Sequence, residues 1–168
     1  SLIDIFGWTI TDGGEDPTCF QPFITTWKTD NPSTSNATSI TIPTTGNGYT
    51  YDVDWDNDGV YDDIGVTGAI THDYDIAGTY TVAIKGNFPR IYFNNSGDKS
   101  KILSIEQWGD ITWTSMNHSF WGCINLIENA SDAPNLSGVS NIDRMFMAAT
   151  SFNQDISNWV VGNNITSM

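Results

Sequence analysis

The stretch Tyr49-Thr-Tyr-Asp-Val-Asp-Trp55 places a large apolar residue at every second position, with small or charged residues between them. Successive side chains of a β-strand point to opposite faces of a sheet, so this period of two predicts a strand with one buried face. The same alternation occurs at residues 40–42 and 80–84. The three segments together predict strands that pack around a shared core.

Turn-forming residues separate the predicted strands. They lie at Asn31-Pro-Ser33, Thr45-Gly-Asn-Gly48, Asp58-Gly59, Gly65 to Gly68 and Ala77-Gly78. Short strands at this spacing, without an amphipathic helical pattern, predict an Ig-like antiparallel β-sandwich over residues 20–95. Residues 1–19 end in turn formers and charges, and we expect them to be an N-terminal arm or linker.

Residues 96–168 have a different texture, rich in Asn, Ser and Trp, and they repeat. Phe120-Trp-Gly-Cys-Ile-Asn-Leu126 matches Phe146-Met-Ala-Ala-Thr-Ser-Phe152 at a sequence offset of 26. A second match, between 136–145 and 159–168, has a sequence offset of 23. Periods in the twenties are typical of leucine-rich repeats, so this mainly-β chain is expected to continue into the first repeats of a solenoid. Because residue 168 lies within a repeat, we also expect the repeats to continue beyond it.

Two segments resemble known families. Met145-Phe-Met-Ala-Ala-Thr-Ser-Phe-Asn-Gln-Asp-Ile-Ser-Asn-Trp159 resembles the repeat of BspA-like leucine-rich-repeat surface proteins of bacteria, and the likeness covers roughly residues 100–168. Ile70-Thr-His-Asp-Tyr-Asp-Ile-Ala-Gly-Thr-Tyr-Thr-Val82 resembles the closing strands of PKD-type Ig-like domains. The resemblance implies a secreted or cell-surface bacterial protein that acts in adhesion or partner recognition.

The chain departs from both families in one respect each. The short Gly-Asp-Gly turn of PKD-type domains is replaced by the longer, more acidic Asp56-Asn-Asp-Gly59. The repeats lack the dense Leu-x-x-Leu-x-Leu of standard leucine-rich repeats, so the shape of each coil is open.

Charge and composition exclude several classes of partner. The chain has 20 acidic and 6 basic residues, a net charge of −14, which repels nucleic-acid phosphates and anionic lipids. No apolar stretch approaches the roughly 18 residues that a membrane span needs, so no membrane insertion of this segment is expected. Cys19 and Cys123 do not form a Cys-x-x-Cys pair, which argues against zinc and thioredoxin chemistry. Whether the two cysteines form a disulfide is open.

The acidic stretch Asp54-Trp-Asp-Asn-Asp-Gly-Val-Tyr-Asp62 fits the nine-residue calcium loop Asp-x-Asp-x-Asp-Gly-x-x-Asp. Carboxylates at alternate positions of a tight loop can converge on one hard cation. The predicted ligands of a structural calcium ion are Asp54, Asp56, Asp58, the carbonyl of Val60, and Asp62. The twelfth position is Gly65, where an EF-hand requires Glu, so a helix–loop–helix sensor is excluded. The alternative is a solvated acidic turn without a metal.

The chain does not read as an enzyme. His72 and His118 belong to no nucleophile or zinc-protease motif. The carboxylates of the acidic loop lie beside a glycine, where we expect them to be hydrated and ionised without the raised pKa of a glycosidase acid. The tryptophans favour core packing, although Trp55, Trp108, Trp113 and Trp121 also allow stacking on sugars.

We therefore expect a non-enzymatic extracellular module that binds protein or glycan through the repeats. The alternative is a structural spacer or glycan-binding accessory domain of a larger extracellular enzyme or virion-surface protein. The ligand and the oligomeric state are open.

Overall fold

The computed structural model describes residues 2–3, 9–10 and 19–167, and these residues form strands and turns without a helix. No described segment is therefore a helix long and apolar enough to cross a bilayer. The strands are β1 (Leu2–Ile3), β2 (Thr9–Ile10), β3 (Phe23–Lys28), β4 (Ser39–Ile42), β5 (Thr50–Asp54), β6 (Asp63–Val66), β7 (Ile70–Asp73), β8 (Thr79–Asn87), β9 (Ile102–Gln107) and β10 (Ile127–Glu128). The expectation of a mainly-β chain is confirmed.

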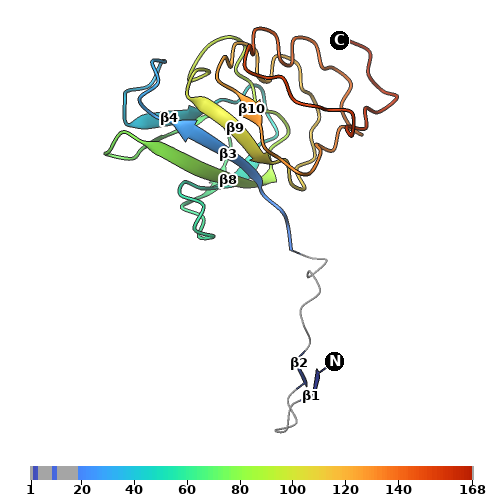
Figure 1. Ribbon diagram of the computed structural model, residues 1–168, viewed down its shortest axis with the longest axis horizontal. Helices are drawn as coiled ribbons and strands as arrows, with labels where there is room; N and C mark the ends of the chain where they lie inside the picture. The colour runs from blue at the N-terminus through green and yellow to red at the C-terminus, as the bar shows by residue number, and fades with distance from the viewer. Residues whose placement is uncertain (1, 4–8, 11–18, 168) are drawn as a thin grey trace.

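Six strands form one mixed sheet in the order β10-β9-β3-β8-β5-β6. Figure 1 labels the first four of these neighbours, β10, β9, β3 and β8. β10 is parallel to β9, and the other neighbours are antiparallel. β4 and β7 form a separate two-stranded antiparallel sheet. Ile40 and Ile42 of β4 share one hydrophobic core with Val53 of β5 and Val82 of β8, so the alternating residues of the sequence line the buried faces.

Two details of the strand prediction are corrected or left untested. Gly65 was expected in a turn, but it lies within β6, where its φ of 69° coincides with a register shift between β5 and β6. An edge strand tolerates this irregularity because it has a single neighbouring strand. Most of the predicted arm at 1–19 lies outside the described residues. Within the described part of the arm, β1 and β2 pair antiparallel.

The sheet and the core continue from one predicted domain into the next. β9 and β10 come from the region expected to form repeats, yet β9 pairs with β3 at the centre of the sheet. The fully buried Lys101, just before β9, donates from Nζ to four oxygen atoms of residues 35–39, at 2.6–3.1 Å. The two regions are therefore joined by a backbone ladder and by a buried cation.

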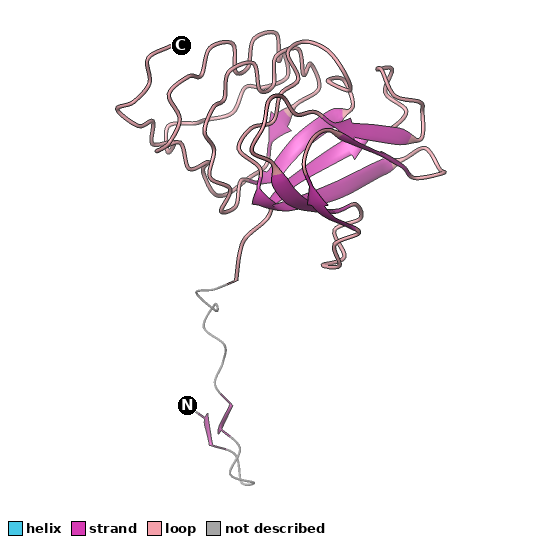
Figure 2. Ribbon diagram, turned by 180° about the vertical axis from the view of Figure 1, so that it is seen from behind, coloured by secondary structure: helices cyan, strands magenta, loops and turns pink. Residues whose placement is uncertain are grey.

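After β9 the chain forms stacked turns, visible as the parallel loops in Figure 2. The backbone N–H groups of residues 116, 118, 120 and 122 donate to the carbonyls of residues 141, 143, 145 and 147 respectively, so the sequence offset is the same in all four bonds. Residues 142 and 167 are bonded at that same offset. We call residues 116–167 the stacked-turn region and residues 23–87 the sheet region.

One predicted repeat match holds and the other does not. Phe120 and Phe146 stack with centroids 5.6 Å apart, in agreement with the offset of 26. The offset of 23 between Leu136 and Trp159 is wrong, because Leu136 forms its β-bridge with Val161. The Trp159 ring reaches Trp108 in the core, at 5.3 Å, from a position just before that bridge. Matching the large side chains therefore misplaced the backbone register.

Candidate functional site

The acidic loop between β5 and β6 brings three of the predicted calcium ligands together. Carboxylate oxygens of Asp54, Asp56 and Asp58 lie within 4.8 Å of one another. Asp54 is buried, whereas the other two are exposed. Gly59 has a φ of 90°, which lets the chain reverse direction at this point. The local arrangement can hold a metal ion with oxygen ligands.

Backbone hydrogen bonds hold these carboxylates in place. The two oxygens of Asp54 accept from the N–H groups of Asp58, at 3.2 Å, and Gly59, at 2.8 Å. Asp58 accepts from the N–H of Val60 at 2.7 Å. Asp62 lies outside the group of three, and its Oδ2 accepts from the N–H of Trp55 at 2.9 Å. Val60 has an exposed side chain, and a role for its carbonyl stays a prediction.

The loop concentrates negative charge on a small area. Loss of hydration, followed by the neighbouring Asp58 and Asp54 carboxylates, raises the pKa of Asp56 above its ordinary value. The repulsion between neighbouring carboxylates is reduced when a cation or a proton binds to them. The loop is therefore electrostatically suited to a hard cation, because it already holds the ligands against their mutual repulsion.

An aromatic stack supports the loop from the side of the core. Trp55 packs on His72 with ring centroids 4.7 Å apart, and its Nε1 donates to Asp63 at 2.7 Å. Tyr74 donates to the carbonyl of Trp55 at 2.9 Å and stacks on Tyr80. Burial raises the pKa of Tyr74, so this phenol stays protonated and continues to donate. His72 thus has a packing role beside Trp55.

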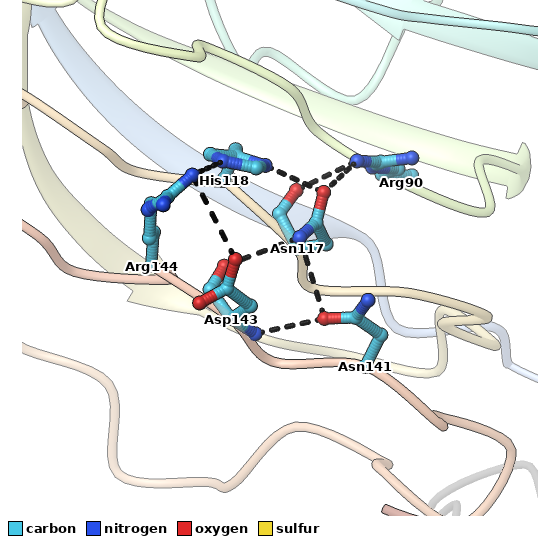
Figure 3. Close-up of polar contacts among 6 residues, drawn as sticks. All are labelled: Arg90, Asn117, His118, Asn141, Asp143 and Arg144. Carbon is cyan, nitrogen blue, oxygen red and sulfur yellow. Dashed lines mark hydrogen bonds and ion pairs between the residues drawn. The ribbon is translucent and has the colours of Figure 1, made fainter. Parts of the chain in front are cut away.

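A second polar cluster lies on the stacked turns (Figure 3). Arg90 donates from Nη2 to the carbonyl and the side-chain oxygen of Asn117, at 2.8 and 2.9 Å. Asn117 in turn donates to Asn141 at 3.3 Å. Arg144 lies 3.9 Å from Asp143. The cluster therefore links side chains of adjacent turns along the surface.

His118 lies between Asn117 and Arg144. Its Nε2 lies 3.1 Å from Nη1 of Arg144, which can donate but not accept, so Nε2 is the acceptor. Nδ1 therefore carries the proton and donates to Asn117 Oδ1 at 2.5 Å. The His118 ring lies 5.1 Å from the half-buried ring of Trp121, and Arg144 lies over the same tryptophan. We call Asn117, His118, Trp121 and Arg144 the repeat face.

The remaining candidates fill structural positions. Trp55, Trp108 and Trp113 are buried, and only Trp121 of the four proposed sugar-stacking tryptophans is half-exposed. Cys19 is exposed and Cys123 is buried, and both are free thiols. Burial raises the pKa of Cys123 well above its ordinary value, which makes its thiol a poor nucleophile.

The repeat face was missed by the sequence reasoning, although a signal for it exists. Asn117-His118 and Asp143-Arg144 lie at the same sequence offset as Phe120 and Phe146. Extending the matched repeat a few positions towards its N-terminus finds both pairs. Arg90 and Arg144 are also the only two arginines of this acidic chain.

Comparison with known proteins identifies one family. Residues 89–168, slightly less than half of the chain, match the model of the family DUF285, described as Mycoplasma protein of unknown function. No curated protein and no solved structure matches the chain. The matched part begins next to Arg90 and contains β9, β10 and the whole repeat face, so this half of the chain is similar to DUF285 proteins.

Proposed function

We propose that this chain is a non-enzymatic recognition module of an exported bacterial protein. In this proposal an Ig/PKD-like sandwich carries the first turns of a BspA-like leucine-rich solenoid, and the repeat face binds a protein or glycan. The observation that carries the proposal is the hydrogen bonding of residues 116–122 to residues 141–147 at a constant sequence offset. Leucine-rich repeats stack at periods of about 20–29 residues, and the observed offset falls in this range.

The internal geometry of the turns supports a true structural repeat. His118 and Arg144 both have a positive φ, as do Gly122 and Ala148, and the two pairs have the same sequence offset. The hydrogen bonds within one turn, from residues 119, 123 and 126, recur from residues 145, 149 and 152. Repeated turns of this kind present equivalent side chains in a row, which suits the binding of an extended partner.

The roles of the reactive side chains support a function without catalysis. His72 stacks on Trp55, and both ring nitrogens of His118 contact neighbouring side chains. Cys123 is buried. Both histidines therefore contact neighbouring side chains, and the acidic loop is better suited to a cation than to acid–base chemistry.

Calcium has a structural part in the proposal. Asp54, Asp56 and Asp58 supply the first carboxylates, with the carbonyl of Val60 and Asp62 as further ligands. Oδ2 of Asp62 accepts a hydrogen bond from the N–H of Trp55. In the proposal, Asp62 binds the ion either through its other oxygen, Oδ1, or through Oδ2 after this hydrogen bond breaks. A bound ion neutralises the repulsion among these carboxylates, and so stabilises the β5–β6 hairpin.

Thermal unfolding in calcium and in chelator tests the metal. At about 100 times its Kd, calcium adds about 2.7 kcal/mol to the free energy of unfolding, or roughly 5–10 °C for a domain of this size. Asp54→Asn abolishes this shift. Asp30→Asn, an exposed change of the same charge in the pair with Lys28, retains it. Identical melting curves in calcium and chelator would remove calcium from the proposal.

Binding of the whole chain to arrays of purified extracellular-matrix proteins and glycans tests recognition. We expect saturable binding that is reduced at least fivefold by Trp121→Ala or Arg144→Ser on the repeat face. Lys28→Ser, on β3, is the matched surface control and leaves binding unchanged. Absence of binding to every arrayed molecule, or equal binding by all variants, contradicts a recognition role for this face and favours the spacer alternative.

A further inference from the structure

A pocket of about 390 Å³ lies at the junction between the sheet region and the family-matched region. Its walls come from three segments that are distant in the sequence: residues 45–49, residues 87–90 and residues 114–115. Small-ligand sites often lie at such junctions, and this volume falls in their usual range of about 300–1,000 Å³. The junction pocket is distinct from the acidic loop and from the repeat face.

Arg90 in this pocket carries an uncompensated charge. Among the described residues no carboxylate lies within ion-pair distance of Arg90, although the chain has 20 acidic residues. Its buried Nε has no hydrogen-bond acceptor in the same part of the chain. Its guanidinium lies 4.3 Å from the centroid of Tyr92, and Nη2 is held by Asn117. A half-buried cation of this kind costs free energy that an anionic ligand recovers.

Besides Arg90, the pocket is lined by five neutral polar side chains and by Gly48, Tyr49 and Pro89. Thr45, Thr114 and Ser115 contribute hydroxyl groups, and Asn47 and Asn87 contribute amides. None of the described residues that line the pocket is acidic. Hydroxyls and amides both donate and accept, which matches the neighbouring hydroxyl groups of a sugar ring.

Size and charge favour one short ligand over a polyanion. A pocket of about 390 Å³ accommodates a small part of a polymer and not an extended acidic chain. The net charge of −14 repels a polyanion as it approaches, whereas a single carboxylate inside the pocket interacts mainly with the nearby Arg90.

We propose that the junction pocket binds a carboxylated sugar residue of a glycan, with the carboxylate on Arg90 and the sugar hydroxyls on Asn47, Asn87 and Ser115. This inference rests on the glycan branch of the proposed function, but it assigns a different site and a ligand class. A guanidinium preorganised by Tyr92 and Asn117 binds a carboxylate through charge-assisted hydrogen bonds without first losing side-chain freedom.

Titration of the ¹⁵N-labelled whole chain, followed by NMR, tests the pocket. The probes are digalacturonic acid against its methyl ester, and sialyllactose against lactose. We expect saturable amide shifts at residues 45–49, 87–90 and 114–115 with at least one carboxylated sugar, and at least tenfold weaker binding of its neutral counterpart. The proposal is overturned if neither carboxylated sugar gives saturable shifts there, or if a tetraglutamate peptide binds the pocket as tightly.

Two variants connect the binding to this pocket. Arg90→Gln is expected to weaken binding of the carboxylated sugar at least tenfold. Because Arg90 also holds Asn117, Asn47→Asp provides a test at an exposed position that leaves those bonds intact. It places a carboxylate in the pocket wall and is expected to weaken binding by a similar factor. Unchanged affinity of Asn47→Asp for the acidic sugar overturns the proposal.

Arg144→Gln separates this proposal from the function assigned to the repeat face. It is the only other arginine, and it does not line the junction pocket. We expect it to leave binding of the acidic sugar unchanged. If Arg144→Gln leaves both array binding and sugar binding unchanged, the repeat-face proposal alone is contradicted. If it weakens both, the acidic sugar is bound at the repeat face and the junction-pocket proposal alone is contradicted.

Discussion

The sheet region and the stacked-turn region satisfy their backbones in different ways. In the sheet region, β3, β5 and β8 exchange hydrogen bonds along continuous antiparallel ladders. In the stacked-turn region, successive turns are joined by N–H groups that bond to carbonyls about one repeat away in the sequence, as residue 120 does to residue 145. A strand can be predicted from the period of two within its own segment. A stacked turn can be predicted only by comparing two repeats that are distant in the sequence.

The largest effect that separates the two regions is expected from Phe120→Ala. Phe120 is fully buried and packs against Phe93, Trp108 and Phe146. Loss of a buried aromatic ring costs about 3–5 kcal/mol, and urea unfolding measures this cost. Hydrogen exchange should show the greatest loss of protection at residues 116–152.

Ile124→Ala is the control for this change. Ile124 lies in the same turn with 45% of its surface exposed, and truncation there should cost less than about 1 kcal/mol. Equal loss of protection in β5 and β8 after Phe120→Ala would mean that the two regions unfold as one unit.

The next effect is expected where the two regions are joined. Lys101→Met removes the ammonium that holds residues 35–39, and leaves four oxygen acceptors without their donor. Because hydrogen bonds to a charged group contribute about 1.5–3 kcal/mol and their effects are not additive, we expect a total loss of about 3 kcal/mol in urea unfolding.

Lys28→Met is the matched control, since Lys28 is half-exposed and forms a surface pair with Asp30. Its cost should be below about 1 kcal/mol. If the two variants are equally stable, Lys101 does not hold the junction together.

Much of the sheet region was predictable from the sequence because its signal is local. β4, β5 and β8 fall on residues 40–42, 49–55 and 80–84, although in β8 Val82, Ala83 and Ile84 are all buried and the expected alternation is lost there. The pairing of β9 with β3 was not anticipated, because residues 102–107 and 23–28 are far apart in the sequence and nothing in either segment specifies the other. Pairing at this distance is determined by the shared core.

The acidic loop was predictable for the same reason, since Asp54, Asp56 and Asp58 occupy alternate positions of one short segment. The repeat face and the junction pocket were not, because each is assembled from several segments. Arg90 and Asn117 are 27 residues apart and their types carry no motif. Tertiary packing, and not a local motif, brings Arg90 and Asn117 together.

A smaller pair of effects compares two equivalent positions of the repeat. Gly122 and Ala148, which follow His118 and Arg144 at the same distance along the chain, have φ values of 82° and 56°. A Cβ at Gly122 would clash with Oδ1 of Asn95, so Gly122→Ala should cost about 2 kcal/mol. Ala148→Gly should instead stabilise the chain by about 0.5–1 kcal/mol, because it relieves a left-handed alanine.

Chemical denaturation of both single variants provides the measurement. Opposite signs support two turns with the same backbone and different neighbours. Destabilisation by both changes would mean that the two turns are not equivalent.

The smallest expected effect compares two carboxyl groups of the C-terminal half whose pKa values are shifted in opposite directions. Burial raises the pKa of Glu128 above its ordinary 4.5, against the bond donated by Trp108, and its Oε2 is buried without a partner among the described residues. The folded state therefore binds this proton more tightly than the unfolded state, and stability is lost as pH rises from about 4.5 through the folded pKa. Glu128→Gln should be more stable than the parent at pH 8, with a difference that shrinks towards pH 4.

Asp155 provides the opposite case on the surface. The Ser157 backbone N–H and hydroxyl lower the pKa of Asp155 below its ordinary 3.8, so its contribution is present at neutral pH and is lost on acidification. Asp155→Asn should therefore be slightly less stable than the parent at pH 8 and equal to it near pH 2. Urea unfolding across this range checks both signs. The same sign for both variants would show that burial of Glu128 does not govern its titration.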